Sequence, residues 1–206
     1  MAKINMNTLI TGLFIIVIII AVFTFVYVNL DQTPEDEEPT NGDEPEPSDN
    51  NDILLTVIYQ DQNITYTLEE LQQLPVTTGN ATFLKEGALP TVIIDGPIAY
   101  EGVTVTSVWD QDWDLPDTYN ISVTASDDWV TEYNHTAITG TVMTFNETTG
   151  NSSGYTQATL LLAYKEDGIL LNESTGGPLK LVYINDTSIT SSRKIAKYVV
   201  TIEITS

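Results

Sequence analysis

The sequence predicts an α+β domain rich in β-strands, preceded by one transmembrane helix and a disordered acidic linker. Three observations lead to this fold class. Short apolar segments such as Leu160–Tyr164 and Leu179–Ile184 are bounded by glycine or proline, which is typical of buried strands. Other segments alternate apolar and polar residues, as half-buried strands do. Only the segment from Thr67 to Leu74 combines a helix-capping pattern with leucines on one helical face.

The chain is organised around the run Thr159–Asn185, in which two apolar segments flank a polar centre. The first segment ends at Asp167-Gly168, a turn signal because glycine accepts positive φ. The second follows Gly176-Gly177-Pro178, where two glycines allow backbone to approach closely and Pro178 fixes φ at the start of the strand. We therefore expect two core strands and a loop between them.

Composition limits the possible functions. The 206 residues carry 7 Lys+Arg against 29 Asp+Glu, a formal charge of -22. A chain this acidic repels phosphate backbones, so nucleic acid is not expected as a partner. The absence of cysteine excludes disulfides, cysteine-ligated zinc, iron–sulfur clusters and thiol catalysis.

Residues 1–30 are predicted to be a membrane anchor. Leu9–Val28 contains no charged residue and is long enough, at about 1.5 Å per residue, to span a bilayer core of about 30 Å. A cleaved signal peptide is the alternative, but its apolar region would be shorter and would end in a small-residue cleavage site. Lys3 precedes the span and no Lys or Arg follows before Lys85. This asymmetry predicts a single-pass protein with a cytoplasmic N-terminus and an extracytoplasmic C-terminal domain.

Residues 31–52 form the predicted linker between the anchor and the folded domain, residues 53–206. The linker has ten acidic residues and four prolines and no aromatic residue. Such a segment cannot bury apolar area to offset chain entropy, so we expect it to be disordered and extended by charge repulsion. Its simplest role is a stalk above the membrane, and the alternative is an acidic docking tail.

A second pattern also predicts an exported domain. From Asn51 on, eight of nine asparagines have Ser or Thr two residues later, with no proline between. This pattern marks N-glycosylation acceptors on an exported surface. The alternative is a strand surface rich in Thr and Asn that carries no sugar. The candidate glycosylation sites are Asn63, Asn80, Asn120, Asn134, Asn146, Asn151, Asn172 and Asn185.

The remaining elements of the domain are predicted from local patterns. The expected helix begins after Thr67, whose hydroxyl can cap the first turn while Glu70 reaches back, and ends at Pro75. A turn at Asp61–Asn63 is expected to join the first two strands, and a polar loop to cover 146–154. Tyr100–Val103 is expected to be a turn into a short element over 103–109, and 133–138 a single helical turn. The expected strands are 53–59, 64–66, 76–83, 91–95, 119–126, 140–145 and 194–204.

Two candidate metal-ligating groups are interpreted as surface residues. Asp110, Asp112 and Asp114 alternate along one loop, but the sixth and twelfth positions of a calcium loop hold Leu115 and Ile121. We therefore expect a solvated acidic loop. His135, the single histidine, lies inside a sequon and has no second His or Cys to partner it, so we expect it to be exposed and without a role as ligand or base.

From Tyr66 to Ile204 the chain resembles the sulfite-oxidase-type molybdopterin-binding domain (the oxidoreductase molybdopterin-binding domain family). The resemblance depends on six fragments that occur in the expected order, each of them short. It implies a sulfite-oxidase-like molybdopterin-domain fold. The fragments are Tyr66–Leu71 with Leu74-Pro75, Tyr100–Val103, Val123–Trp129, Leu162–Tyr164 with Asp167-Gly168, Gly176–Val182, and Lys197-Tyr198 leading to Ile202–Ile204.

The chain departs from the catalytic family at two places. In the family a cysteine thiolate ligates molybdenum after the first helix, and here 76–87 contains none. The family's glycine-rich loop usually carries His and Arg where this chain has Thr175 and Lys180, and Lys180 keeps the charge but loses bidentate phosphate binding. Lys197 matches the family's lysine. The resemblance implies a small anion pocket formed by Gly176, Gly177, Lys180 and Lys197; the alternative is that both lysines are ordinary surface cations.

Three hypotheses for function follow. The preferred one is a membrane-anchored, extracytoplasmic, glycosylated domain with this fold, without molybdenum catalysis and with no cofactor, that acts as a binding or interaction module beside a membrane protein partner. The second is a molybdopterin-dependent oxidoreductase whose metal has no cysteine ligand. The third is a β-rich surface or adhesion protein kept soluble by sugars and acidic charge.

Overall fold

The computed structural model describes residues 52–85, 91–109 and 112–206. The predicted span Leu9–Val28 and the linker up to Asn51 lie outside the described residues. The described residues all belong to one compact unit, Pro47–Ser206. Within them, no helix has the length and apolar character needed to cross a membrane.

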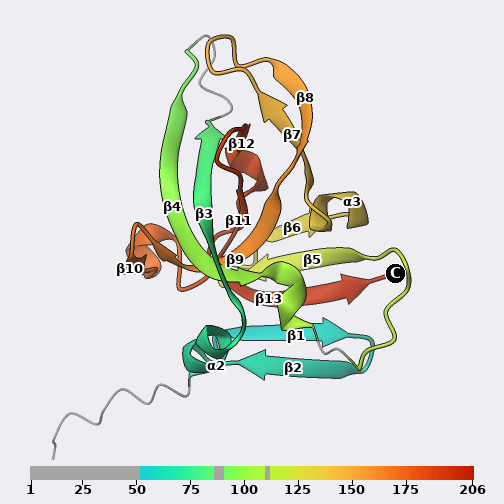
Figure 1. Ribbon diagram of the computed structural model, residues 1–206. Coiled ribbons are helices and arrows are strands. Elements are labelled where there is room, and N and C mark those ends of the chain that lie inside the picture. Colours follow the sequence, from blue (N-terminus) through green and yellow to red (C-terminus); the bar gives the residue numbers. More distant parts are fainter. Residues whose placement is uncertain (1–51, 86–90, 110–111) are drawn as a thin grey trace, which may run out of the picture. The chain divides into compact units, whose positions relative to one another are not determined.

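The first sheet of the described part has the strand order β2-β1-β13-β5-β6 (Figure 1). Its neighbours are antiparallel except for β1 and β13, which are parallel. The C-terminal strand therefore lies between the first strand and β5, which joins both ends of the domain in one sheet. The strands are β1 (Leu55–Tyr59), β2 (Gln62–Tyr66), β5 (Asn120–Ala125), β6 (Val130–Tyr133) and β13 (Val199–Thr205).

The second sheet has the order β10-β9-β4-β3-β12-β7-β8 within the described residues, and β11 also pairs with β9. Here β3 and β12 are parallel and the other pairs are antiparallel. The strands are β3 (Val76–Leu84), β4 (Ile94–Thr104), β7 (Thr141–Phe145), β8 (Ser152–Gln157), β9 (Thr159–Glu166), β10 (Ile169–Leu170), β11 (Lys180–Ile184) and β12 (Ile189–Ser191).

The described helices are short, and the predicted capping box is confirmed. Thr67 Oγ1 accepts a hydrogen bond from the Glu70 backbone N–H at 3.2 Å, while the Thr67 N–H donates to Glu70 Oε2 at 2.8 Å. These two bonds satisfy backbone groups that the first turn leaves free. The helices are α2 (Leu68–Gln73) and α3 (His135–Ile138), with 3₁₀ turns η1 (Val105–Val108), η2 (Glu173–Thr175) and η3 (Ser192–Lys194).

Two apolar clusters share strand β9. Leu160, Leu162 and Tyr164 belong to the larger cluster, which also takes in the apolar residues of β1, β5 and β13. Leu161 and Ala163 point to the other face of the strand and join the smaller cluster with residues of β3 and β4. Successive side chains of a strand point to opposite faces. The continuous apolar run in the sequence thus reflects burial on both faces.

Several predicted boundaries are wrong. Tyr100–Val103 is not a turn, because it lies in the long strand β4, with Gly102 buried against β9. The predicted loop over 146–154 is too long, because β8 begins at Ser152. The first hairpin turns at Gln60 and Asp61, and β2 starts at Gln62. The closing strand begins at Val199 rather than at 194, where η3 lies. Strands β6, β8, β10 and β12 are additions that the sequence analysis did not predict.

Replacing Leu162 with alanine is expected to destabilise the domain by about 2–5 kcal/mol, because its fully buried side chain leaves a cavity between the two sheets. Urea unfolding followed by circular dichroism measures this. Leu170→Ala, at a leucine 44% exposed, is the matched control and should change stability by less than about 0.5 kcal/mol. Equal effects of the two substitutions would contradict the burial of β9.

Candidate functional site

The structure brings the predicted glycines and lysines together. Gly176 adopts the left-handed conformation (φ 88°), and a Cβ added there would lie 2.8 Å from Lys197 Cδ and 3.3 Å from Lys180 Cε. The backbone carbonyl of Gly176 accepts a hydrogen bond from the Tyr198 N–H at 2.8 Å. A Cβ on Gly177 would lie 2.4 Å from Leu171 Cβ. Both glycines are therefore required by close packing within the loop, whether or not a ligand binds.

Lys180 is buried, with 5% of its surface exposed, and its charge is neutralised by the protein itself. Its ammonium forms an ion pair with the carboxylate of Glu166, at the end of β9. It also lies 5.8 Å from the centre of the Tyr100 ring, within reach of a cation–π interaction. A buried charge requires a partner, and Glu166 provides it. A ligand anion at Lys180 would have to compete with this carboxylate.

Tyr100, on the neighbouring strand β4, is the third residue of the group that contains Lys180 and Glu166. It lies opposite Glu166 in the register of β4 and β9. Burial raises the pKa of the Tyr100 hydroxyl well above its ordinary value, and the charge and hydrogen bond of Glu166 raise it further. Tyr100 therefore stays neutral at physiological pH. The group Lys180–Glu166–Tyr100 is charge-balanced.

Lys197 is exposed, and only its aliphatic stem is held, against Gly176. Among the described residues no ion pair involves Lys197; those found are Lys85–Asp95, Lys165–Glu101 and Lys180–Glu166. Of the two lysines that the resemblance implied, Lys197 is therefore the one open to solvent. Because Glu166 neutralises Lys180, the positive charge at this loop is smaller than that of a pocket with two open lysines.

The prediction that His135 is exposed is wrong. His135 is half-buried at the start of α3, and its ring lies edge-on to Tyr119 with centroids 5.4 Å apart. Its Nδ1 is buried without a hydrogen-bond partner in the described part of the molecule. The same region holds no group of three His, Cys, Asp or Glu side chains arranged for a metal.

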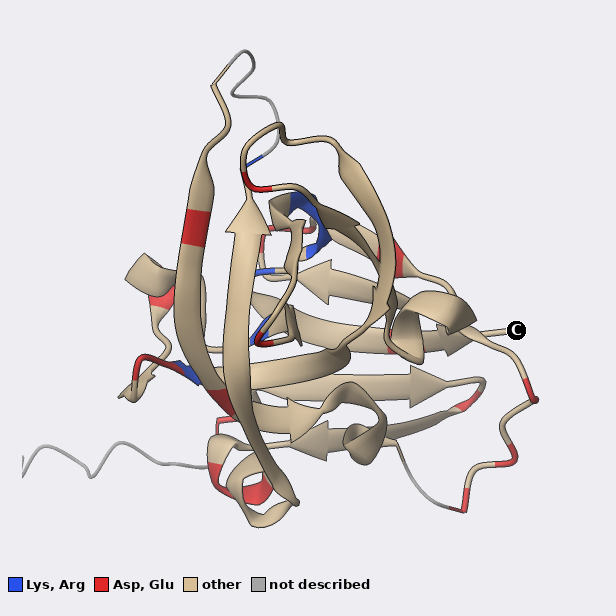
Figure 2. Cartoon of the chain, turned by 45° about the horizontal axis from the view of Figure 1, so that its top comes forward, with Lys and Arg blue, Asp and Glu red and all other residues tan. Residues whose placement is uncertain are grey.

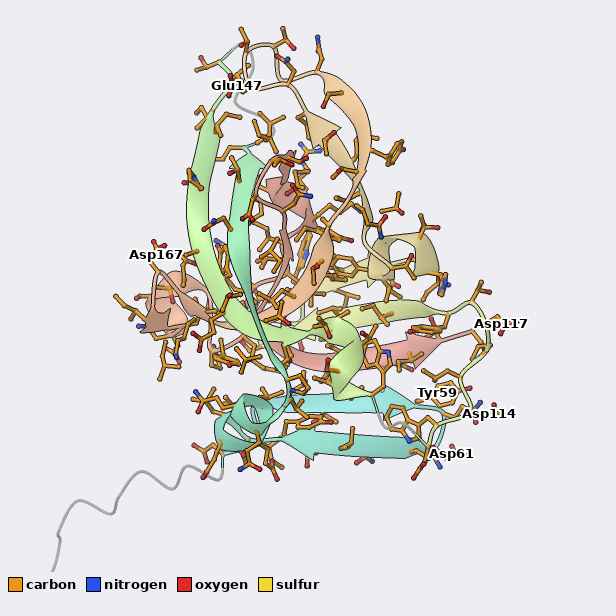
Figure 3. The ribbon with its side chains drawn as sticks, in the orientation of Figure 1. Tyr59, Asp61, Asp114, Asp117, Glu147 and Asp167 are labelled. Carbon is orange, nitrogen blue, oxygen red and sulfur yellow. The ribbon has the colours of Figure 1, made fainter. Side chains whose placement is uncertain are left out.

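The acidic residues labelled in Figure 3 lie on loops at the periphery of the domain. Asp61, Asp114 and Asp117 are at the end that holds the β1–β2 turn, where the Tyr59 hydroxyl donates to the Asp114 carbonyl at 3.0 Å. Glu147 lies at the tip of the β7–β8 hairpin. The described carboxylates of the predicted acidic loop, Asp112 and Asp114, are both exposed.

Sequence reasoning missed a cleft of about 490 Å³ that lies over β7, β8, α3 and η3. We call it the basic cleft, because it contains Arg193 and Lys194. Adjacent cations are unusual in a chain with 7 Lys+Arg and 29 Asp+Glu, so this pair was the sequence signal that could have indicated the cleft. The other lining residues are Asn134, Ala137, Thr141, Val142, Met143, Phe145, Tyr155, Tyr183 and Ser191.

The basic cleft differs in charge from the rest of the described surface. Figure 2 shows blue segments at few places and red segments spread over both sheets. Two of the eleven residues that line the cleft are cations and none is an acid. The lining of the cleft is therefore richer in cations than the chain as a whole.

The chain's own residues do not fit a molybdopterin group as the family holds it. The sequence has no thiol to ligate the metal. Lys180, the counterpart of the family's phosphate-binding residue, is already paired with Glu166. In this chain the thiol is therefore absent, and the buried lysine of the loop is already occupied by a carboxylate.

Comparison with protein-family models gives no match for this sequence, and comparison with curated proteins gives none either. Among solved structures, the chain is similar to the sulfane dehydrogenase SoxCD from Paracoccus pantotrophus, with a TM-score of 0.54 and 15% sequence identity. The match covers 76% of this chain and 39% of that chain. At this identity the likeness shows the fold alone, a distant molybdopterin-domain-like fold.

Removing the ammonium of Lys180 is expected to destabilise the fold. Lys180→Met leaves Glu166 and the Tyr100 hydroxyl beside an apolar side chain, at an expected cost of about 2–4 kcal/mol in urea unfolding. Because half-buried Glu166 retains some hydration, the lower end of this range is expected. Lys197→Met serves as the control and should change stability by less than about 0.5 kcal/mol.

Adding Glu166→Leu to Lys180→Met should restore part of the lost stability, since no unpaired carboxylate then remains. A double variant as unstable as the sum of the single changes would argue against the ion pair.

Proposed function

We propose that this protein is a membrane-anchored extracytoplasmic domain with a molybdopterin-domain-like fold that works as a non-catalytic binding module. The observation that carries the proposal is the charge-balanced group Lys180–Glu166–Tyr100, which replaces an open cation in the glycine loop. The absence of cysteine adds to it. The apolar span Leu9–Val28, the acidic linker 31–52 and the sequons support the location.

A molybdopterin-dependent oxidoreductase is the second candidate, and the likeness to SoxCD favours it. In that case Gly176 and Gly177 would line the cofactor, Lys197 would contact its phosphate, and the group would supply redox chemistry. The metal would need a ligand other than cysteine. The likeness also weighs against a surface adhesion protein, the third hypothesis, because the fold extends over 76% of the chain.

Metal analysis tests the proposal directly. Full-length protein purified from a host that makes the molybdenum cofactor is expected to contain far less than one molybdenum per chain by mass spectrometry of the metal. A molar equivalent of molybdenum, lost in Lys197→Glu but kept in the surface variant Lys85→Glu, would overturn the proposal and establish the second candidate.

The sequons provide a test of location. Seven of the eight asparagines are exposed, whereas Asn185 is half-buried and its side-chain amide donates to the Gln157 carbonyl at 2.7 Å. Attachment of a sugar requires access to this amide. Glycopeptide mapping of protein from its native membrane is expected to find sugars at exposed sites such as Asn63 and Asn151 and least at Asn185. Unmodified peptides at all eight positions would contradict the glycosylation proposal.

A further inference from the structure

We infer that one end of the domain docks on the surface of a zwitterionic lipid bilayer through exposed apolar side chains. We call this end the entry end, because the described chain enters the domain there. The inference rests on the proposed function, since it assumes the membrane anchor, and it adds the surface that the domain turns toward the membrane. The entry end is defined by Ile53, Trp129, Val130, Ile169 and Leu170.

Strand pairing brings the β5–β6 turn to the place where the described chain begins. Strands β1 and β13 are parallel, with Thr56 beside Thr201, so the residues just before β1 lie near the start of β13. Strand β13 is antiparallel to β5, with Val199 beside Ala125, the last residue of β5. Figure 1 shows β1 and β13 both beginning on the side of the sheet that carries α2. Trp129 and Val130 follow directly after the β5–β6 turn.

Hydrogen bonds join this turn to the loop between β10 and β11. The Ser126 N–H donates to the Tyr198 carbonyl at 2.8 Å, and the Tyr198 N–H donates to the Gly176 carbonyl at 2.8 Å. The loop folds back tightly toward β10, because a Cβ added to Gly177 would lie 2.4 Å from Leu171 Cβ. Strand β10 ends one residue before this leucine, and Figure 1 shows it on the same side as α2. The β5–β6 turn and β10 therefore share one end of the domain.

The entry end exposes large apolar side chains that the described domain leaves uncovered. Trp129 is 72% exposed and Ile169 is 70% exposed, while Ile53, Val130 and Leu170 range from 44% to 61%. These are five of the nine exposed large apolar side chains in the described part, so they are concentrated at one end. Tryptophan and branched aliphatic side chains are suited to the boundary between lipid headgroups and acyl chains. Such a surface favours an apolar or interfacial occupant.

The predicted linker places a bilayer within reach of this end. The linker, residues 31–52, has 22 residues and leads directly into Ile53. A flexible chain of this length has a root-mean-square span of about 26 Å, from about 5–6 Å × √22, and its acidic residues extend it further. A tether of this reach gives an effective concentration of about millimolar. A few exposed apolar side chains are then enough to hold the domain on the bilayer.

Charged residues at the entry end determine which lipid is favoured. Asp127 and Asp128 are exposed in the β5–β6 turn, Asp167 is exposed next to β10 (Figure 3), and Glu173 is exposed in η2. Lys197 is an exposed cation at the same end. These carboxylates would repel anionic headgroups and meet no net charge on phosphatidylcholine. We therefore expect docking on zwitterionic lipid, and weaker docking when anionic lipid is added at low salt.

The absence of cysteine allows a direct test with single labelled positions. Full-length protein with Ile169→Cys, labelled with the environment-sensitive fluorophore NBD, is reconstituted in phosphatidylcholine vesicles. Production in a host without N-glycosylation keeps sugars off Asn172, which lies next to the entry end. Lipid spin-labelled near the headgroup is expected to quench this label at least about twofold more than a label at Tyr155→Cys. Tyr155 is the matched control, because it is 69% exposed but lies on β8, outside the entry end.

Substitution of the tryptophan tests whether apolar contact holds the domain on the lipid. Trp129→Gln, added to the Ile169→Cys protein, is expected to lower the ratio of docked to free domain about tenfold, because it removes the largest apolar side chain of the entry end. Tyr155→Gln in the same background should leave this ratio within about twofold. Thermal unfolding of each variant verifies that the fold is intact.

Equal quenching at positions 169 and 155, or an unchanged ratio in Trp129→Gln, would overturn the inference. Absence of quenching in vesicles of pure lipid would also overturn it, and would point to a protein partner with an apolar, basic surface as the occupant. Flotation of the full-length chain with the vesicles tests the anchor separately. Protein that does not float with them overturns the anchor together with the docking, whereas protein that floats without quenching overturns the docking alone.

Discussion

The fold depends on the burial of both faces of strand β9. Leu160, Leu162 and Tyr164 face one apolar cluster while Leu161 and Ala163 face the other, so the strand divides the interior in two. Each face of β9 must be apolar, and the strands that pair with its two edges must approach its backbone closely. Gly102 on β4 meets this second requirement: a Cβ there would lie 2.1 Å from the Leu162 carbonyl oxygen.

The position of Lys180 follows from this arrangement. As the first residue of β11, it pairs in register with Ala163 and is drawn below the surface by the apolar residues that follow it. An ammonium at that depth must be neutralised, and Glu166 at the end of β9 lies within reach. The pair thus stabilises the junction of β9 and β11. The loop that the sequence resemblance implied to be an anion pocket thus has its buried lysine paired with the chain's own carboxylate.

The sequence predicted correctly those features whose signal is contained in a few neighbouring residues. The Thr67–Glu70 capping box and the run Leu160–Tyr164 are contained in a few residues, and both were found correctly. Strand β8 was missed because five of its six residues are exposed, which removes the apolar alternation that marks a strand. Strand β12 has three residues and depends on β3 and β7 for its hydrogen bonds. Such strands are defined by their partners and not by their own sequence.

The candidate sites were also hard to predict, because they depend on residues that are distant in the sequence. Gly176 and Lys197 lie side by side. Glu166 was not recognised as the partner of Lys180, because no spacing rule joins residues fourteen positions apart across two strands. The basic cleft draws its lining from β7, β8, α3, β11 and η3, segments that only the folded chain brings together. What the sequence did contain was the adjacent cations Arg193 and Lys194. In a chain with 7 Lys+Arg and 29 Asp+Glu, such a pair is the part of the cleft that a local sequence pattern could have indicated.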